Sequence, residues 1–440
     1  MPVVCLPGTI DALRLHALNP RRYPYLLQTL GGSGWDITFA FPQQTILYSL
    51  ADLARPGPSF FSLLDSAWHS ASSSENAADL PFRGGWFVYL GYELLHQLEP
   101  KVTCPAHDAE FPVGCLTRIP AAVMVDHKAQ LTYLFAEEAF SACLDLLRAD
   151  IAAAPRFDPQ PVGVRHLDEE DEMLFLDGVG RIKEYIRAGD VFQVNLSRRW
   201  QAELDDATTA PELYANLRSV NPAPFSGLAD FGSCQIISSS PERLVKVTDQ
   251  LVETRPIAGT YPRSADPVED ERLRQALLVH PKERAEHVML VDLERNDLGR
   301  ICQPGSMRVD ELMAVQTYAH VHHIESSVQG RLRAGISPGT VLGALFPGGT
   351  ITGCPKVRTM QIISELEATP RLAYTGSMGY LNHDGSMDFN ILIRSFMLQG
   401  NLLSFRAGAG IVADSVPERE LQETRTKAKG LLRALGASQG

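Results

Sequence analysis

The stretch Arg406–Lys427, with the sequence RAGAGIVADSVPERELQETRTK, predicts a strand that is followed by a helix. Residues 406–412 form the strand, and Gly408 and Gly410 stand where a larger side chain would obstruct a ligand. We therefore expect a glycine-lined strand with a charged helix beside it.

The predicted helix carries three charged residues on one face. Ser415 and Glu418 have the S-x-x-E spacing of a capping box, which predicts where the helix begins. Glu420, Glu423 and Lys427 follow at i, i+3 and i+7, so they share a face. Two carboxylates and an ammonium beside such a strand could hold a divalent cation and an anionic ligand together. A solvated helix with a surface ion pair fits the same spacing, which leaves both interpretations open.

Length and composition indicate a globular protein of two or three domains. The chain has 440 residues, of which 45% are hydrophobic and 21% are charged. Its net charge of −12 argues against a nucleic-acid-binding protein, because phosphate neutralisation requires a basic surface. No apolar run is long enough to span a membrane, and no secretion signal is visible. The seven cysteines are scattered without a C-x-x-C pair, so we expect reduced thiols in a cytoplasmic protein.

The chain is expected to divide into two units. Residues 152–168 contain three prolines and few large apolar side chains, which is typical of a linker. We therefore predict an N-terminal region at 1–155, where no catalytic cluster is visible, and a catalytic domain at 165–440. The expected fold class is α+β, with antiparallel sheets packed face to face and helices outside; the family resemblance described below contributes to this expectation.

Polar residues in the second unit gather on predicted strands and at their ends. The strand Val191–Trp200 places Phe192, Val194 and Leu196 on one face and Gln193, Asn195 and Ser197 on the other. Glu242 follows the strand Gln235–Ser240, and Pro256–Thr260 follows another strand. Residues 292–300 look turn-rich, and residues 388–398 read as a single strand in which Arg394 would need an anionic partner. The glycine-rich turn Phe346–Lys356 feeds a helix whose N-terminus could bind a carboxylate.

Residues Asp190 to Lys429 resemble the chorismate-utilising enzymes. The resemblance rests on several motifs in order: FQVNLSRR, SSPERL, RPIAGT, PKERAEHVMLVDLERNDLGR, FPGGTITGCPKVR, YTGSMGYL, MDFNILIR and GAGIVADS with its acidic helix. It implies Mg²⁺-dependent chemistry on chorismate, a cyclohexadiene that carries two carboxylates.

The resemblance also assigns roles to individual residues. Glu286 and Glu423 match the magnesium ligands, with Glu420 beside them, and the metal would stabilise negative charge as the C4 hydroxyl leaves. Glu242 matches the general acid that protonates this hydroxyl, with a raised pKa expected beside a bound dianion, and His323 matches a histidine near the leaving group. Arg394 and Tyr374 match the residues that hold the enolpyruvyl carboxylate. The same pocket is assigned Gln193, Gly259, Thr260, Thr350, Gly408 and Lys427.

The nucleophile predicted from Gln193 is ammonia. Family members that add water resemble this chain in the same strand but carry a lysine base there, and glutamine cannot deprotonate water. Two aminating reactions remain: amination at C4, as in aminodeoxychorismate synthase component I, and amination at C2 with loss of pyruvate, as in anthranilate synthase component I. No Gly-x-Cys-x-Gly glutaminase motif is visible, so we expect a separate glutamine amidotransferase subunit to deliver ammonia.

Two motifs favour amination at C4 and one residue favours amination at C2. FPGGTITG resembles the aminodeoxychorismate branch, and the tryptophan-sensing LLES motif is replaced by Leu26–Thr29, LLQT. Ala258, however, stands where the well-known aminodeoxychorismate form has a lysine that attacks C2 covalently. We expect C4 amination, either with another nucleophile such as Cys354 or by a route without an adduct; anthranilate synthase remains the alternative.

Overall fold

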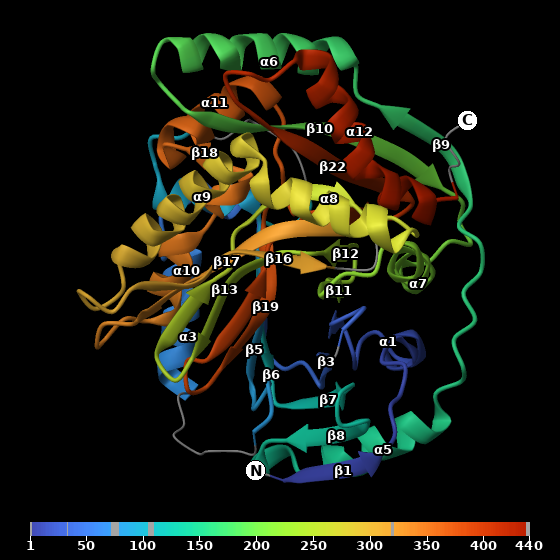
Figure 1. Ribbon diagram of the computed structural model, residues 1–440. Helices are drawn as coiled ribbons and strands as arrows, with labels where there is room; N and C mark the ends of the chain where they lie inside the picture. Colours follow the sequence, from blue (N-terminus) through green and yellow to red (C-terminus); the bar gives the residue numbers. More distant parts are fainter. Residues whose placement is uncertain (1, 33, 72–78, 104–109, 318–320, 437–440) are drawn as a thin grey trace.

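The computed structural model describes residues 2–32, 34–71, 79–103, 110–317 and 321–436; within these ranges the side chains of Thr260, Pro262, Lys282 and Val321 are not described. Two large antiparallel sheets form the centre of this structure (Figure 1). Within the described part of the chain, no helix has the length and apolarity that crossing a membrane requires.

The first sheet joins strands from both predicted units. Its order is β1-β8-β7-β3-β2-β11-β12-β21-β22-β10-β18, with β9 paired to β10. The bounds are β1 (Val3–Pro7), β2 (Tyr25–Gln28), β3 (Trp35–Ala40), β7 (Ala121–Asp126), β8 (Leu131–Ala136), β9 (Val164–Glu169), β10 (Gln193–Leu204), β11 (Phe225–Asp230), β12 (Cys234–Ser240), β18 (Gly353–Cys354), β21 (Ser395–Gln399) and β22 (Leu402–Ile411).

The second sheet also combines both units. Its order is β15-β17-β14-β13-β20-β19-β5-β6-β4, with β16 paired to β17. The bounds are β4 (Thr45–Tyr48), β5 (Gly85–Leu90), β6 (Gly114–Ile119), β13 (Arg243–Thr248), β14 (Leu251–Thr254), β15 (Ile257–Pro262), β16 (Arg308–Thr317), β17 (Val321–Arg331), β19 (Ser377–Asn382) and β20 (Met387–Asn390). Residues 1–155 therefore do not form a sheet of their own.

The inner faces of the two sheets pack against each other. The rings of Tyr25 on β2 and Phe87 on β5 stack with centroids 3.9 Å apart. Phe39 from the first sheet and Tyr380 from the second belong to the same buried cluster. Burying large aromatic side chains between two sheets is a major source of stability in such a core. The prediction of an α+β fold with sheets packed face to face is confirmed.

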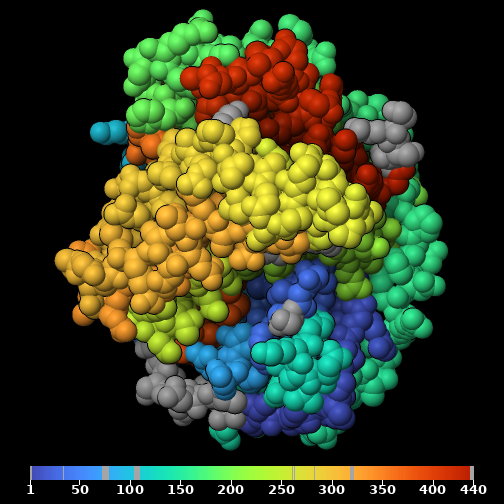
Figure 2. All heavy atoms as spheres, viewed as in Figure 1, coloured from blue at the N-terminus to red at the C-terminus, as the bar shows by residue number. Residues whose placement is uncertain are grey.

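Helices cover the outer surfaces of the sheets (Figure 1). α6, α11 and α12 lie over β10 and β22, where their apolar faces form one cluster with the strands. The bounds are α1 (Leu13–Leu18), α2 (Leu50–Leu53), α3 (Phe60–Ala71), α4 (Leu95–Leu98), α5 (Cys143–Ala153), α6 (Glu172–Arg187), α7 (Ala210–Val220), α8 (Pro267–Val279), α9 (Pro281–Gly299), α10 (Pro338–Leu345), α11 (Lys356–Glu367) and α12 (Pro417–Ala434), with short 3₁₀ turns η1 (Tyr92–Leu94), η2 (Glu138–Phe140) and η3 (Gly349–Ile351). The space-filling view shows α8 and α9 (yellow) covering one face beside α12 (red) (Figure 2).

Two expectations about helices were wrong. The predicted capping box does not form, because α12 begins at Pro417 with Val416 as its N-cap, while the Ser415 hydroxyl accepts from the N–H of Val412 (3.0 Å). Proline at the first helical position fixes the helical φ and needs no N–H there. Residues 292–300 are not turn-rich, because α9 continues to Gly299; its buried Leu293 and Leu298 supply an apolar face.

Two expectations about strands were also wrong. Residues 388–398 are not one strand, because β20 ends at Asn390 and β21 begins at Ser395. Phe192 precedes β10 and is 67% exposed, so it does not share the buried face of Val194 and Leu196.

Candidate active site

The polar face of β10 and the glycines of β22 form the floor of the candidate site. Asn195 lies directly opposite Gly410 in the antiparallel pair, and Gly408 is two residues further along β22. A Cβ on Gly408 would lie 2.7 Å from Oδ1 of Asn195 and 2.8 Å from the hydroxyl of Tyr374; one on Gly410 would lie 2.3 Å from Nε2 of Gln193. Glycine is required at position 408, where a Cβ would also lie 2.8 Å from the carbonyl oxygen of Leu196, whereas at position 410 a Cβ would displace the end of the Gln193 side chain.

Two helices bring charged groups to this floor. Nε2 of Gln193 donates to Oε1 of Glu286 on α9 (2.7 Å). On α12, Nζ of Lys427 lies 2.8 Å from Oε1 of Glu423 and donates to the carbonyl oxygen of Gly408 (3.0 Å). Desolvation works against the charge of Lys427, but Glu423 and, more weakly, Glu286 hold its pKa above the usual value. The charged groups of α9 and α12 therefore meet over the same strand pair.

Glu242 completes one wall of the site. It lies between β12 and β13, and the hydroxyl of Thr350 donates to its Oε1 (2.6 Å). Burial raises the pKa of Glu242 to about 7, although Thr350, Lys427 and Arg394 lower it; Glu325 adds to the increase. Because Lys427 interacts with Glu242 as well as with Glu286 and Glu423, it links the predicted acid to two of the predicted metal ligands.

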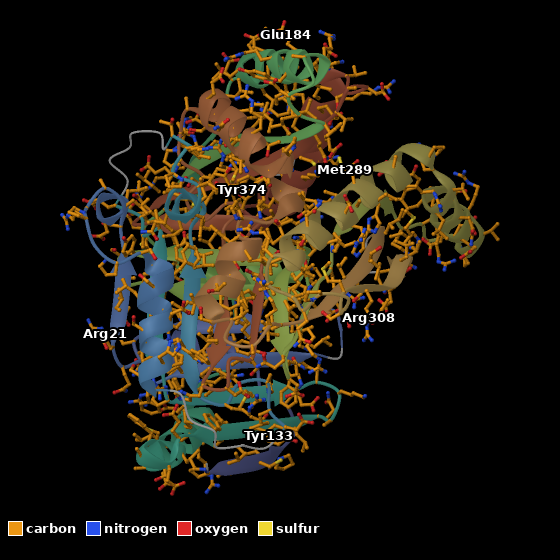
Figure 3. The ribbon with its side chains drawn as sticks, turned by 90° about the vertical axis from the view of Figure 1, so that its left-hand side faces the viewer. Arg21, Tyr133, Glu184, Met289, Arg308 and Tyr374 are labelled. Carbon is orange, nitrogen blue, oxygen red and sulfur yellow. The ribbon has the colours of Figure 1, made fainter. Side chains whose placement is uncertain are left out.

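Arg394 and Tyr374 lie in connections between strands, Arg394 directly before β21 and Tyr374 shortly before β19. Arg394 has φ +51°, and its carbonyl oxygen accepts from the N–H of Ser239 (3.1 Å). No described residue hydrogen-bonds its guanidinium, whose pKa is lowered by burial and raised by Glu242. Tyr374 is buried, in the middle of the molecule in Figure 3, and its ring lies 5.4 Å from the guanidinium carbon of Arg371. A buried arginine that has no hydrogen-bond partner among the described residues suits the binding of a carboxylate.

The remaining predicted residues lie at the β15–β17 edge of the second sheet. His323 is buried, and its Nε2 lies 3.6 Å from Oε2 of Glu325, which also acts on Glu242. Thr260 pairs with His323 in the sheet, but its side chain lies outside the described part of the structure. Gly259 has φ +67°, and a Cβ there would lie 2.8 Å from Oε2 of Glu283. The positive φ and the close packing against Glu283 therefore explain why glycine stands at position 259.

Glu286, Glu420 and Glu423 are the predicted magnesium ligands. In the part of the chain that the structure describes, no three His, Cys, Asp or Glu side chains are arranged as a metal-binding group. The donor chemistry nevertheless fits Mg²⁺, which prefers carboxylate oxygens. Glu286 already points at the floor, with Oε1 3.6 Å from where a Cβ of Gly410 would be, and Glu423 stands beside Lys427. Glu420 is buried on the same helix.

Sequence reasoning missed a buried ion network behind the floor. Arg371 donates to both carboxylate oxygens of Glu367 (2.6 and 2.9 Å), and Oε2 of Glu367 also accepts from Arg406 (3.1 Å). The same guanidinium donates to the carbonyl oxygens of Asn195 (2.8 Å) and Ile351 (3.2 Å). Arg371 therefore ties the β10 floor to the turn that carries Thr350. Glu367 stands four residues before Arg371, but Asn195 and Arg406 are distant in the chain, so local sequence spacing could indicate this ion pair and not the network.

Replacing Arg371 with methionine is expected to destabilise the fold by about 3–5 kcal/mol, because a buried Glu367 would lose the stronger of its two cationic partners. Urea denaturation followed by circular dichroism measures this change. Arg308→Met, at a 62% exposed side chain, is the matched control and should change the unfolding free energy by less than about 0.5 kcal/mol. Equal losses in both variants would contradict the role of the network.

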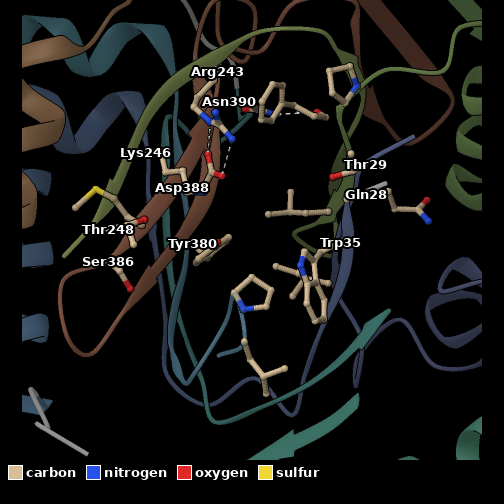
Figure 4. A pocket seen from close by; sticks show the side chains of 18 of the residues that line it. Gln28, Thr29, Trp35, Arg243, Lys246, Thr248, Tyr380, Ser386, Asp388 and Asn390 are labelled. Atoms are coloured by element: carbon tan, nitrogen blue, oxygen red, sulfur yellow. Dashed lines mark hydrogen bonds and ion pairs between the residues drawn. The ribbon is translucent and has the colours of Figure 1, made fainter. Parts of the chain in front are cut away.

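A cavity of about 610 Å³ lies between the two sheets, apart from this site (Figure 4). Its lining includes Gln28, Thr29 and the ion pair of Arg243 with Asp388, and none of the predicted site residues. The amide of Gln28 is committed within the protein: Nε2 donates to Asp36 (2.7 Å), and Oε1 accepts from the hydroxyl of Tyr214 (2.8 Å).

Comparison with known proteins shows which family this chain belongs to. The model of the chorismate binding enzymes matches residues 23–433. This chain belongs to that family. A chorismate-utilising enzyme is therefore what the sequence motifs predicted and what the comparison confirms.

Proteins similar to this chain carry the names of two different enzymes. An anthranilate synthase component I-like protein of Synechocystis is 41% identical over 86% of this chain and 78% of its own length. Aminodeoxychorismate synthase component 1 of Bacillus subtilis is 40% identical over 85% of this chain and 82% of its own. The crystal structure of anthranilate synthase component I from Streptococcus pneumoniae superposes with a TM-score of 0.80 at 32% identity, over 92% of this chain and 93% of that one. Similar identity to both kinds of relative leaves the reaction to be argued from the site.

Proposed function

We propose that this chain is the chorismate-aminating component of an aminodeoxychorismate synthase. It would convert chorismate and ammonia to 4-amino-4-deoxychorismate and water, a step towards 4-aminobenzoate and folate. The observation that carries the proposal is the hydrogen bond from Gln193 to Glu286 on the floor of the site. An amide in this position offers no base for activating water, whereas ammonia needs none.

The side chains support a division of roles. Glu242, whose pKa is raised to about 7 by burial, is protonated in about half of the molecules at pH 7 and would donate this proton to the departing C4 hydroxyl. Arg394 and Tyr374 would hold the enolpyruvyl carboxylate, and Lys427 would balance negative charge near the ring. Mg²⁺ held by Glu286 and Glu423 would bind the ring carboxylate and stabilise developing negative charge. The proton that Glu242 gives up is replaced by one from the new ammonium group, so the reaction releases only water.

Amination at C4 is favoured by the glycine-rich turn and by the contacts of Gln28 in the cavity between the two sheets. Thr350, which binds Glu242, lies in the FPGGTITG segment that resembles the aminodeoxychorismate branch. Gln28 stands where the tryptophan-sensing motif has glutamate, and its amide is already occupied. Ala258 is the observation that favours the alternative, amination at C2 by an anthranilate synthase component I.

Ala258 also bears on the route to C4. A lysine adduct cannot form at this position, and Ala258 is buried in β15. Cys354 pairs with Gln193 in the sheet and so lies near the site, but burial and Asp292 raise the pKa of its thiol. A thiol with a raised pKa is a poor nucleophile at neutral pH. These observations support a route without a cysteine adduct.

Ammonia would come from a separate glutamine amidotransferase subunit, aminodeoxychorismate synthase component II, in the cytoplasm. The purified chain, given chorismate and Mg²⁺, is expected to turn over with ammonium chloride and not with glutamine. The product should become 4-aminobenzoate only after a lyase is added, whereas anthranilate would fluoresce directly. Direct formation of anthranilate would contradict the C4 assignment, and glutamine-dependent turnover by this chain alone would contradict the separate subunit.

A further inference from the structure

Two buried side-chain oxygens on the floor of the site have no hydrogen-bond partner. Oε1 of Gln193 and Oδ1 of Asn195 are both inaccessible to solvent, and no described residue donates to either. Buried polar atoms in folded proteins are almost always paired, so each exception calls for an explanation. The two residues lie two positions apart on β10, with their side chains on the same face.

The strand around these oxygens is held in place. The N–H of Asn195 donates to the carbonyl oxygen of Thr352 (2.9 Å), and its carbonyl oxygen accepts from Arg371 (2.8 Å). Nε2 of Gln193 is fixed by Glu286, which directs the amide. Two positions along a strand span about 7 Å, so side-chain oxygens at these positions can converge on one small molecule.

No described residue donates a hydrogen bond to either oxygen, although the Tyr374 hydroxyl lies in the same region as Asn195. Lys427 gives two of its three protons to Glu423 and to the carbonyl oxygen of Gly408, and the carboxylate of Glu286 is itself an acceptor. A ligand that satisfies this region must therefore be small and rich in N–H or O–H donors. Chorismate offers mostly acceptors, namely two carboxylates and an ether oxygen, with the C4 hydroxyl as its one donor, whereas ammonia offers three N–H donors and keeps its lone pair free for attack.

We propose that Oε1 of Gln193 and Oδ1 of Asn195 together bind the ammonia nucleophile, which makes Asn195 a specificity-determining residue. The inference rests on the proposed function, because it names the subsite that an aminating enzyme would need. Ammonia held by two amide oxygens keeps a free lone pair for the ring carbon, while water held in the same place would find no base.

The test is the variant Asn195→Leu, which removes the acceptor and keeps the branched shape and the number of heavy atoms of the side chain. Steady-state rates are measured at fixed pH with ammonium chloride varied at saturating chorismate, and with chorismate varied at saturating ammonium chloride. We expect the KM for ammonium to rise about fivefold to tenfold, the effect of losing one hydrogen bond, while the KM for chorismate changes less than twofold. Gln193→Met should raise the KM for ammonium as well. Gln201→Met, an exposed glutamine on the same strand, is the matched control and should leave both values unchanged.

The outcomes separate this subsite from the reaction itself. A wild-type chain without ammonium-dependent turnover would overturn the proposed function, and this subsite with it. An unchanged KM for ammonium in a folded and active Asn195→Leu variant would overturn the subsite alone. A rise confined to the KM for chorismate would show that the oxygen serves the substrate and would also overturn it. Asn195→Ala carries the same test if the leucine variant does not fold.

Discussion

Replacing Glu242 with glutamine is expected to lower kcat about a thousandfold while the fold stays intact. General acid catalysis by a positioned carboxyl contributes about two to four orders of magnitude, and glutamine has no proton to give to the C4 oxygen. The amide still accepts the hydrogen bond from Thr350, which is 2.6 Å in the native protein. The loss should therefore appear in kcat, measured by coupled product formation, with little change in the KM for chorismate.

The pH dependence of the native enzyme follows from the same residue. Burial raises the pKa of Glu242 from about 4.5 to about 7, so the acid form persists to neutral pH. Activity that requires this proton is fully present well below pH 7, is halved near pH 7 and declines further as the pH rises. A plot of kcat/KM, which reports on the free enzyme, should show this alkaline limb. In Thr350→Val, the loss of a donor that favours the ionised carboxylate should move the limb to higher pH.

A surface carboxylate provides the control. Glu184→Gln changes an exposed residue at the edge of the molecule in Figure 3 and should leave kcat and its pH profile unchanged. If Glu242→Gln retained more than about a tenth of the native kcat, Glu242 would not be the general acid.

The floor of the site could be predicted because its information is local. The alternation of Gln193, Asn195 and Ser197 is visible in the sequence, and so are the glycines at 408 and 410. The structure adds the register, which puts Asn195 opposite Gly410. It also corrects the reason for the glycines: the groups that a Cβ would displace belong to the protein itself.

Long-range contacts are what sequence reasoning could not supply. The role of Arg371 was not predicted: Glu367 is only four residues away, but Asn195 reaches Arg371 only because α11 packs against β10. The division at residues 155–165 rests on linker composition, yet β2 pairs with β11 across it. The composition of a segment can indicate a linker, but it does not indicate which strands pair across that segment.

The start of α12 shows how two local signals compete. Ser415 and Glu418 have capping-box spacing, but Pro417 lies between them and suits the first position of a helix. The proline places the N-cap at Val416, which frees Ser415 to close the turn on Val412. The shift does not alter the face shared by Glu420, Glu423 and Lys427, so the prediction about the charged face was independent of the error.

Removing divalent cations with EDTA is expected to abolish turnover, and adding Mg²⁺ should restore it. Glu286→Gln should raise the Mg²⁺ concentration for half-maximal activity at least about a hundredfold. Losing a residue that only orients a ligand costs 10–100-fold in metal affinity, so losing a ligand should cost no less. Glu286 is a better position for this test than Glu423, because Glu423→Gln would also release Lys427 from its 2.8 Å ion pair. Isothermal titration with Mg²⁺ in the presence of chorismate measures binding separately from turnover.

The site also predicts why the metal should bind weakly without substrate. Glu286 accepts from Gln193, and Glu423 is paired with Lys427, so a cation must compete with donors that are already in place. A bound chorismate carboxylate would supply a further oxygen ligand and attract Lys427, which tips the balance towards the metal. Mg²⁺ affinity should therefore rise with chorismate, and by linkage chorismate affinity should rise equally with Mg²⁺. Glu418→Gln, an exposed change at the start of the same helix, is the control and should alter neither affinity. Full activity after exhaustive EDTA treatment would show that Glu286 and Glu423 do not hold a metal ion that the reaction needs.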